Sequence, residues 1–264
     1  MVLQGGGEGF APPFDASPYY ETTAPEVPAA ERQIAYENCE AIVSLFQTTD
    51  DVSRILPEGI EPLSNPPTAA VMLTHYPFST VGEYNEYLAL VQVADLDGEP
   101  AYYIPYIYVT NDRALIAGRE MAGAPKKLAS MELDTEGSVV TGSLERPAGT
   151  RLADLSVTPD QRAVGGMLDA IIGERMPLLS IRHLPPIEGG DGCTQLVKWY
   201  AEIDFHEDQQ GRPKRWMGTG SLEYPTASPQ DPVHTVAVEE PLATVYGRFD
   251  MALGATEVHR EWEL

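Results

Sequence analysis

Three consecutive runs of β-type residues lie between residues 69 and 109, "AAVMLTHYPF", "YNEYLALVQVADL" and "AYYIPYIYV". They are rich in Tyr, Val, Ile and Leu, which favour the pleated and half-buried surface of a strand. The segment "DLDGEP" separates the last two runs and has the composition of a hairpin turn. This stretch therefore predicts antiparallel β-structure. More strands are expected in "KLASMELDTEGSVVTGSLER", with a turn at Gly137, and in several runs after residue 193.

Helical patterns are fewer and shorter. "DDVSRILPEGIEPL" predicts a short helix that ends at Pro57, and "TNDRALIAGRE" predicts a second one capped by Thr110 or Asn111. The strongest helical pattern is "TPDQRAVGGMLDAIIGERM", with Pro159 near the first turn. "AYENCEAIVSLFQTT" mixes helix and strand character.

The domain organisation is simple. Residues 1–30 are rich in Gly and Pro and predict an extended N-terminal arm without a core of its own. No repeat and no change of composition divides the remainder, so residues 31–264 are expected to form a single domain. The expected fold class is α+β and mainly antiparallel β.

The charge balance restricts the partners. Seventeen Lys and Arg against 40 Asp and Glu give a formal net charge of −23, and such a field repels nucleic acid and anionic membranes. No apolar run is long enough to span a bilayer, and the start lacks the pattern of a signal peptide. Two widely separated cysteines, Cys39 and Cys193, fit a reducing compartment. We therefore expect a soluble, cytoplasmic protein.

Common cofactor and metal motifs are absent from the sequence. There is no P-loop and no G-x-S-x-G motif, and "GGGEGF" lacks the preceding strand of a dinucleotide site. The five histidines show no spacing typical of metal ligands. We expect no cofactor and no metal, so that side chains carry the chemistry.

Two adjacent lysines, Lys126 and Lys127, follow Pro125 in "REMAGAPKKLASMEL". An ordinary lysine has a pKa of about 10.4, so about one amine in 2,500 is neutral at pH 7 and able to attack a carbonyl. A second cation or an apolar pocket can favour the neutral amine. On a strand the two lysines point to opposite faces, which weakens the first explanation. We therefore predict that Lys126 lies in an apolar pocket and Lys127 outside it. The alternative is a solvated pair at a strand start.

A second group of candidate residues is in "GEYNEYLALVQV". On a strand Tyr84, Glu86 and Leu88 share one face. A carboxyl between an aromatic ring and leucines is partly removed from water, which suits it to proton transfer. The alternative is a carboxylate on the rim of a sheet edge.

Together, "GEYNE" and "TNDRALIAGREMAGAPKKL" closely resemble the acetoacetate decarboxylase superfamily. Its members carry a Tyr-x-Glu strand, a short helix with Gly-Arg-Glu, and then Pro-Lys-Lys. Weaker similarity extends through "ILPEGIEPL" and "RMPLLSIRHLPPIEGG". The resemblance implies a closed, cone-like antiparallel β-barrel with flanking helices, and a homo-oligomer. It also implies that Lys126 is a Schiff-base lysine and that Glu86 is the acid/base of the pocket.

Further residues are expected in or beside this pocket. The motif itself contributes Lys127, Arg119 and Glu120. Tyr84 is best placed to orient a water or a leaving hydroxyl, with Tyr106 and Tyr246 as alternatives.

The chain departs from the family pattern at two positions. Decarboxylases of this family also carry an arginine in the N-terminal third and a second pocket glutamate. The corresponding positions fall in "YENCE", residues 36–40, and at or beside Val71, and neither stretch supplies the expected residue. These losses remove groups that hold the departing carboxylate. The iminium remains available, and it still acidifies the neighbouring carbon.

The preferred hypothesis is therefore an aldolase-dehydratase or hydratase that acts on a pyruvate-like 2-oxo acid with an aldehyde or enone. Arg113, Arg119 and Arg32 are the candidates to bind the substrate carboxylate. One alternative is a true acetoacetate or β-keto acid decarboxylase that uses an arginine from elsewhere, such as Arg32. The other is a barrel that binds a small ligand without catalysis.

Overall fold

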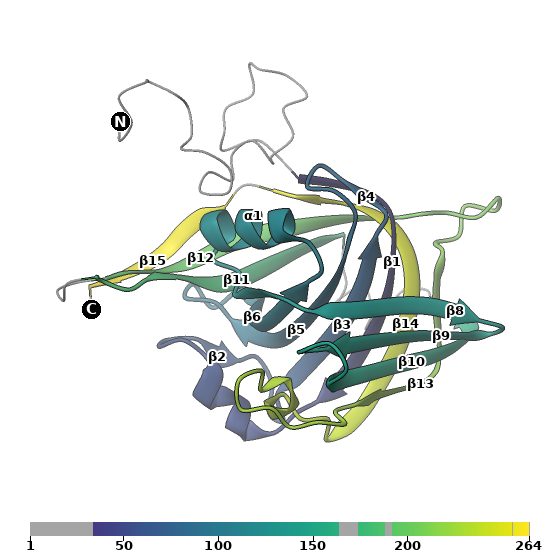
Figure 1. Cartoon of the computed structure of the whole chain (residues 1–264), viewed down its shortest axis with the longest axis horizontal. Helices are drawn as coiled ribbons and strands as arrows, with labels where there is room; N and C mark the ends of the chain where they lie inside the picture. The colour runs from purple at the N-terminus through teal and green to yellow at the C-terminus, as the bar shows by residue number, and fades with distance from the viewer. Residues whose placement is uncertain (1–33, 164–173, 188–191, 255, 264) are drawn as a thin grey trace, which may run out of the picture.

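The computed structural model describes residues 34–163, 174–187, 192–254 and 256–263, which form a mostly β structure (Figure 1). Seven strands close into a barrel in the order β12–β11–β6–β5–β3–β1–β14, because β14 pairs back onto β12. Neighbours are antiparallel except for β6 and β11. The predicted fold class, mainly antiparallel with a closed barrel, is confirmed. The barrel strands are β1 (Ile34–Gln47), β3 (Thr68–Tyr76), β5 (Tyr84–Ala94), β6 (Pro100–Val109), β11 (Arg175–Leu184), β12 (Cys193–Phe205) and β14 (Glu240–Leu253).

Four further strands continue the sheet from β14 and fold back over the outside of the barrel. They are β8 (Ser130–Glu136), β9 (Val139–Glu145), β10 (Arg151–Arg162) and β13 (Arg215–Glu223). Short edge strands are β2 (Glu61–Pro62), β4 (Phe78–Ser79), β7 (Lys126–Leu128) and β15 (Glu257–Glu263). The helical elements of the described residues are α1 (Asp112–Ala122) and the 3₁₀ turns η3 (Asp50–Ile55) and η4 (Val233–Thr235).

The central barrel strands β3 and β5 are mostly buried on both faces, and the two faces belong to different cores. The barrel core fills the interior and contains Leu88 and Leu90 of β5. The outer core lies between the barrel and the added strands, and it contains Tyr87 and Ala89 of the same strand. Because side chains alternate along a strand, the near-continuous apolar runs of the sequence supply both cores at once.

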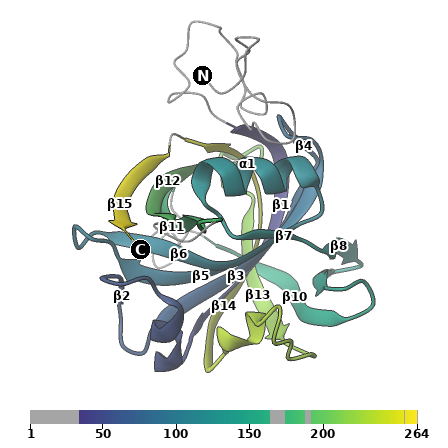
Figure 2. The ribbon, with the colours of Figure 1, turned by 60° about the vertical axis from the view of Figure 1, so that its left-hand side comes forward.

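Helix α1 covers one end of the barrel (Figures 1 and 2). Asn111 caps its start by accepting the backbone N–H of Arg113 at 2.7 Å, as predicted. Gly123 ends it with φ of 68°, a left-handed conformation that favours glycine. The inner face of α1 contributes Ala114, Ala117 and Ala122 to the barrel core. The chain then turns directly into β7.

Two sequence-based expectations differ from the structure. The mixed segment at residues 35–49 is mostly one strand, because β1 pairs with β14 on one side and β3 on the other. Pro159 does not begin a helix, since it belongs to β10. It lies at an irregularity in the pairing with β13, where a residue without a backbone N–H is tolerated. The rest of that predicted helix lies mostly outside the described residues.

Other expectations hold. The short helical turn η3 ends before Pro57, and Gly137 occupies the turn between β8 and β9 with φ of 62°. The N-terminal arm, residues 1–30, lies outside the described residues, so the proposed division at residue 31 stays a prediction. Within the described part of the chain, no helix combines the length and apolar character needed to cross a membrane.

Candidate active site

Strand β7 places the two lysines on opposite sides of the sheet. It runs parallel to β6, with Lys126 beside Ile107 and Lys127 beside Tyr108. Ile107 belongs to the barrel core and Tyr108 to the outer core. Lys126 therefore faces the barrel interior, where it is only 5% exposed, as strand alternation predicts.

Inside the barrel the amine of Lys126 contacts a carboxylate. Its Nζ donates to Oε2 of Glu86 at 2.8 Å, and both side chains are buried. The same Nζ lies 5.7 Å from the ring centroid of Tyr84, within the range of a cation–π interaction. Strand β5 supplies both Tyr84 and Glu86 from one face, as the sequence predicts. A proton can pass directly between the amine and the carboxylate at this distance.

Gly118 on α1 leaves the room that the lysine side chain occupies. A Cβ at this position would lie 2.5 Å from Cε and 2.6 Å from Cδ of Lys126. Carbon atoms in van der Waals contact are about 3.5–4.0 Å apart. The glycine of the Gly-Arg-Glu segment thus allows Lys126 to lie flat against the helix.

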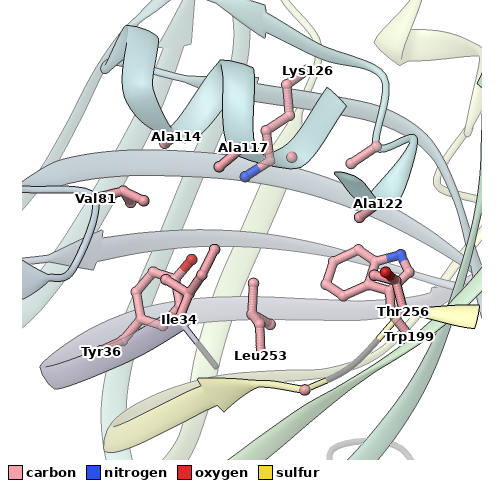
Figure 3. A pocket seen from close by; sticks show the side chains of 13 residues that line it. Ile34, Tyr36, Val81, Ala114, Ala117, Ala122, Lys126, Trp199, Leu253 and Thr256 are labelled. Atoms are coloured by element: carbon pink, nitrogen blue, oxygen red, sulfur yellow. The ribbon is translucent and has the colours of Figure 1, made fainter. Parts of the chain in front are cut away.

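The amine of Lys126 borders a narrow cavity beneath α1 (Figure 3). The cavity encloses about 20 Å³, room for about one water molecule. Its walls are mostly apolar, and Lys126 is the one charged side chain among its described lining residues. The lining residues are Ile34, Tyr36, Val81, Ala114, Ala117, Gly118, Ala122, Ala124, Lys126, Trp199, Leu253, Gly254 and Thr256.

Three buried tyrosines surround the pair. Tyr76 donates its hydroxyl to Oε1 of Glu86 at 3.3 Å, and Tyr84 donates to the hydroxyl oxygen of Tyr36 at 3.2 Å. Burial first, and then the carboxylate of Glu86, raise the pKa of Tyr76 and Tyr84 well above the ordinary value. Both hydroxyls therefore stay protonated and can act as hydrogen-bond donors to the site.

Nothing in the local sequence around Tyr36 or Tyr76 separates them from ordinary core residues. Tyr76 comes to the site because it pairs with Tyr84 across β3 and β5. Tyr36 is brought in by β1, which lies far away in the sequence.

The remaining residues of the motif lie around the site without lining the cavity. Arg119 donates its Nη1 to the carbonyl of Lys126 at 3.1 Å and so supports the main chain. Glu120 and Arg113 are exposed on α1. Arg32 lies outside the described residues. The sequence predicts an arginine that binds the substrate carboxylate, but among the described residues no arginine lines the cavity.

Three further candidate residues belong to the outer core, away from the amine of Lys126. Tyr106 packs there and shares a hydrogen bond of 2.9 Å with the hydroxyl of Thr235. Tyr246 donates to Glu40 at 2.8 Å. Val71 is fully buried in the outer core. These three residues lie on the outer face of the barrel strands, whereas Glu86 lies on the inner face. Which face of each strand points into the barrel is decided by barrel closure.

One group of side chains in the described residues has the geometry of metal ligands. The ligand atoms of Asp95, Asp97 and His259 lie within 4.8 Å of one another. Asp95 already accepts the amine of Lys198 at 2.6 Å. A cation bound there would meet that ammonium group, so the arrangement fits an ion pair better than a metal site.

Comparison with known proteins identifies the family. The profile of the family described as "Acetoacetate decarboxylase (ADC)" matches residues 12–262. The chain belongs to the acetoacetate decarboxylase family. Its members are enzymes, and the Tyr-x-Glu strand, the Gly-Arg-Glu helix and the Pro-Lys-Lys segment meet at the site described above.

Individual relatives span nearly the whole chain. "Decarboxylase DEC1" of Cochliobolus heterostrophus is 29% identical over 256 residues, covering 94% of this chain and 90% of that protein. The structure of acetoacetate decarboxylase from Legionella pneumophila has a TM-score of 0.76 at 22% identity and covers 93% of this chain and 95% of that one. The enduracididine biosynthesis enzyme MppR, complexed with pyruvate, has a TM-score of 0.67 at 20% identity and covers 86% and 89%. The two solved structures share the fold.

Proposed function

We propose that the protein is a Schiff-base lyase in which Lys126 condenses with the ketone of a short 3-oxo acid and releases carbon dioxide. The observation that carries this proposal is a buried amine 2.8 Å from a buried carboxylate, at the wall of an apolar cavity. The similarity to proteins named as decarboxylases supports the reaction type. The cavity has room for about one water molecule, so it would have to widen to admit even a short 3-oxo acid.

The reaction balances with the residues of the site. Glu86 takes a proton from the amine of Lys126, which adds to the C3 carbonyl; water leaves and an iminium forms. The proton on Glu86 leaves with the carbinolamine hydroxyl as water. The bond between C2 and the carboxyl group breaks, its electron pair enters the iminium, and carbon dioxide and an enamine result. Glu86, protonated again from solvent, then donates a proton to C2, and water hydrolyses the new iminium to a methyl ketone and free Lys126. One proton is consumed in each turnover.

Two features of the site favour loss of the carboxylate. The lining offers no described cation besides Lys126 to neutralise a carboxylate that stays through the reaction. A carboxylate near Glu86 in an apolar cavity is poorly solvated, and its departure as carbon dioxide relieves that cost. A 2-oxo acid, in contrast, retains its carboxylate throughout the reaction, from the binding of the substrate until the release of the product.

A lyase that acts on a pyruvate-like 2-oxo acid is the second candidate. Residues 36–40 contain no arginine. On β3 the residues beside Val71 that face the barrel core are Ala70 and Met72, and neither replaces the second glutamate of decarboxylases. A related fold is known in complex with pyruvate. In this candidate the enamine adds to an aldehyde or eliminates water.

Both candidates predict a covalent adduct, and the product separates them. The protein is incubated with acetoacetate, or with pyruvate and an aldehyde, and carbon dioxide and carbon–carbon bond formation are measured in parallel. Borohydride should fix the substrate on Lys126, detectable by peptide mass. The variant K126A should lose both the borohydride adduct and the formation of product. K214A, which removes a lysine outside the cavity, should keep both. Absence of any adduct on the wild-type protein would overturn the proposal.

A further inference from the structure

Two lysines on β7 face two buried carboxylates on opposite sides of the sheet. Lys126 pairs with Glu86 inside the barrel at 2.8 Å, and Lys127 pairs with Asp231 outside it at 2.9 Å. Each amine also lies near a tyrosine ring, at 5.7 Å inside and 5.9 Å outside. Each lysine thus pairs with a buried carboxylate beside a tyrosine ring, although the Lys127 side chain is 40% exposed and the Lys126 side chain only 5%. A slip of β7 by one residue would exchange the two lysines, because the side-chain period of a strand is two.

Backbone pairing alone specifies the register of β7 weakly. The strand has three residues, and in the described structure it pairs with β6 alone. Few ladder hydrogen bonds can form over three residues of a single edge. Other contacts must therefore decide which lysine enters the barrel.

Asp231 supplies such contacts from the segment between β13 and β14. Its buried Oδ1 accepts from Nζ of Lys127 at 2.9 Å, from Nε of Arg146 at 3.1 Å and from the hydroxyl of Tyr108 at 3.2 Å. Tyr108 is the β6 neighbour of Lys127 in the observed register. One oxygen thus joins neighbouring residues of β6 and β7.

Arg146 strengthens the same arrangement. Besides its bond to Asp231, it donates Nη1 to the carbonyl of Leu128, the last residue of β7. A slipped strand would break this contact and would set the amine of Lys126 opposite Tyr108. The observed register therefore allows all of these hydrogen bonds of Asp231 and Arg146 to form at the same time.

We infer that Asp231 is a positioning residue that fixes the register of β7 through Lys127 and thereby sets Lys126 opposite Glu86. In this arrangement Lys127 anchors the strand and takes no part in the chemistry. The inference rests on the proposed function, because the position of Lys126 is measured through its formation of a Schiff base.

The test measures which lysine reacts. The full chain is incubated with acetone and borohydride, and the adduct is assigned to Lys126 or Lys127 by fragment masses. The wild-type protein should carry it on Lys126 alone. In D231N the rate of labelling at Lys126 should fall about ten- to hundredfold, since a misplacement of about 1 Å can cost that much. Part of the adduct should appear on Lys127, which a general loss of stability would not produce.

Two further variants keep the test decisive. K127M removes the anchor from the other side and should slow labelling of Lys126 to a similar extent. D95N removes the carboxylate of another buried ion pair, with Lys198, at the opposite end of β5 from Glu86. It should destabilise the protein and leave the adduct on Lys126 at the wild-type rate. Wild-type labelling in both D231N and K127M would overturn the inference while the proposed function stands. An unlabelled wild-type protein would overturn the proposed function itself.

Discussion

Gly118→Ala is expected to inactivate the protein without unfolding it. The added Cβ would lie 2.5 Å from Cε, 2.6 Å from Cδ and 3.1 Å from Nζ of Lys126. Relief of these overlaps requires a shift of about 1 Å to restore ordinary carbon contacts. The atoms that must move belong to the end of a flexible side chain, so the backbone of α1 need not change.

The substitution should affect the reaction rate much more than the free energy of unfolding. A displacement of about 1 Å at a reacting group can lower the rate about a hundredfold, which corresponds to about 2.7 kcal/mol in the activation free energy. Alanine, in contrast, favours a helix interior over glycine by about 1 kcal/mol. The free energy of unfolding should therefore stay within about 1 kcal/mol of the wild-type value.

The assay combines the rate of carbon dioxide release, the rate of borohydride labelling at Lys126 and thermal unfolding. Gly142→Ala serves as the control, because its Cβ would meet the side-chain tip of Leu73 at 3.2 Å in another part of the sheet. That variant should keep the labelling rate. Full activity in G118A would refute the reasoning, since it would mean that Lys126 does not lie across Gly118 when it reacts.

Three more predictions follow from buried ionisable groups. E86Q removes the carboxylate that exchanges a proton with the amine, so kcat should fall about 10²- to 10⁴-fold; an unchanged pH–rate profile and rate would contradict this role. Burial opposes ionisation of Asp95, but hydrogen bonds from Lys198 and from backbone N–H groups outweigh it and lower its pKa in the folded state. Its contribution to stability is therefore present above about pH 4 and is lost as pH falls through that lowered pKa, so urea unfolding of the wild type and D95N should converge in acid. Burial raises the pKa of Cys39 to about 12, so iodoacetamide at pH 8 should label Cys193 and spare Cys39 until the protein unfolds; labelling of native Cys39 would count against its burial.

The opposite faces of the two lysines and the shared face of Tyr84 and Glu86 could be predicted from the sequence. Both follow from the alternation of side chains along a strand, which is a property of the local backbone. The same holds for the helix cap at Asn111 and the turn at Gly137, where a local hydrogen bond or backbone conformation decides the structure.

Tertiary structure alone decided which face became the interior. The sequence pattern of β3 and β5 is apolar on both sides, since each strand lies between two cores. Tyr76 could therefore not be told apart from Tyr106 or Tyr246 as a residue of the site until the strands paired and the barrel closed. Asp231 reaches Lys127 from 104 residues away, and contacts of that kind arise from packing between distant segments, which no local periodicity encodes.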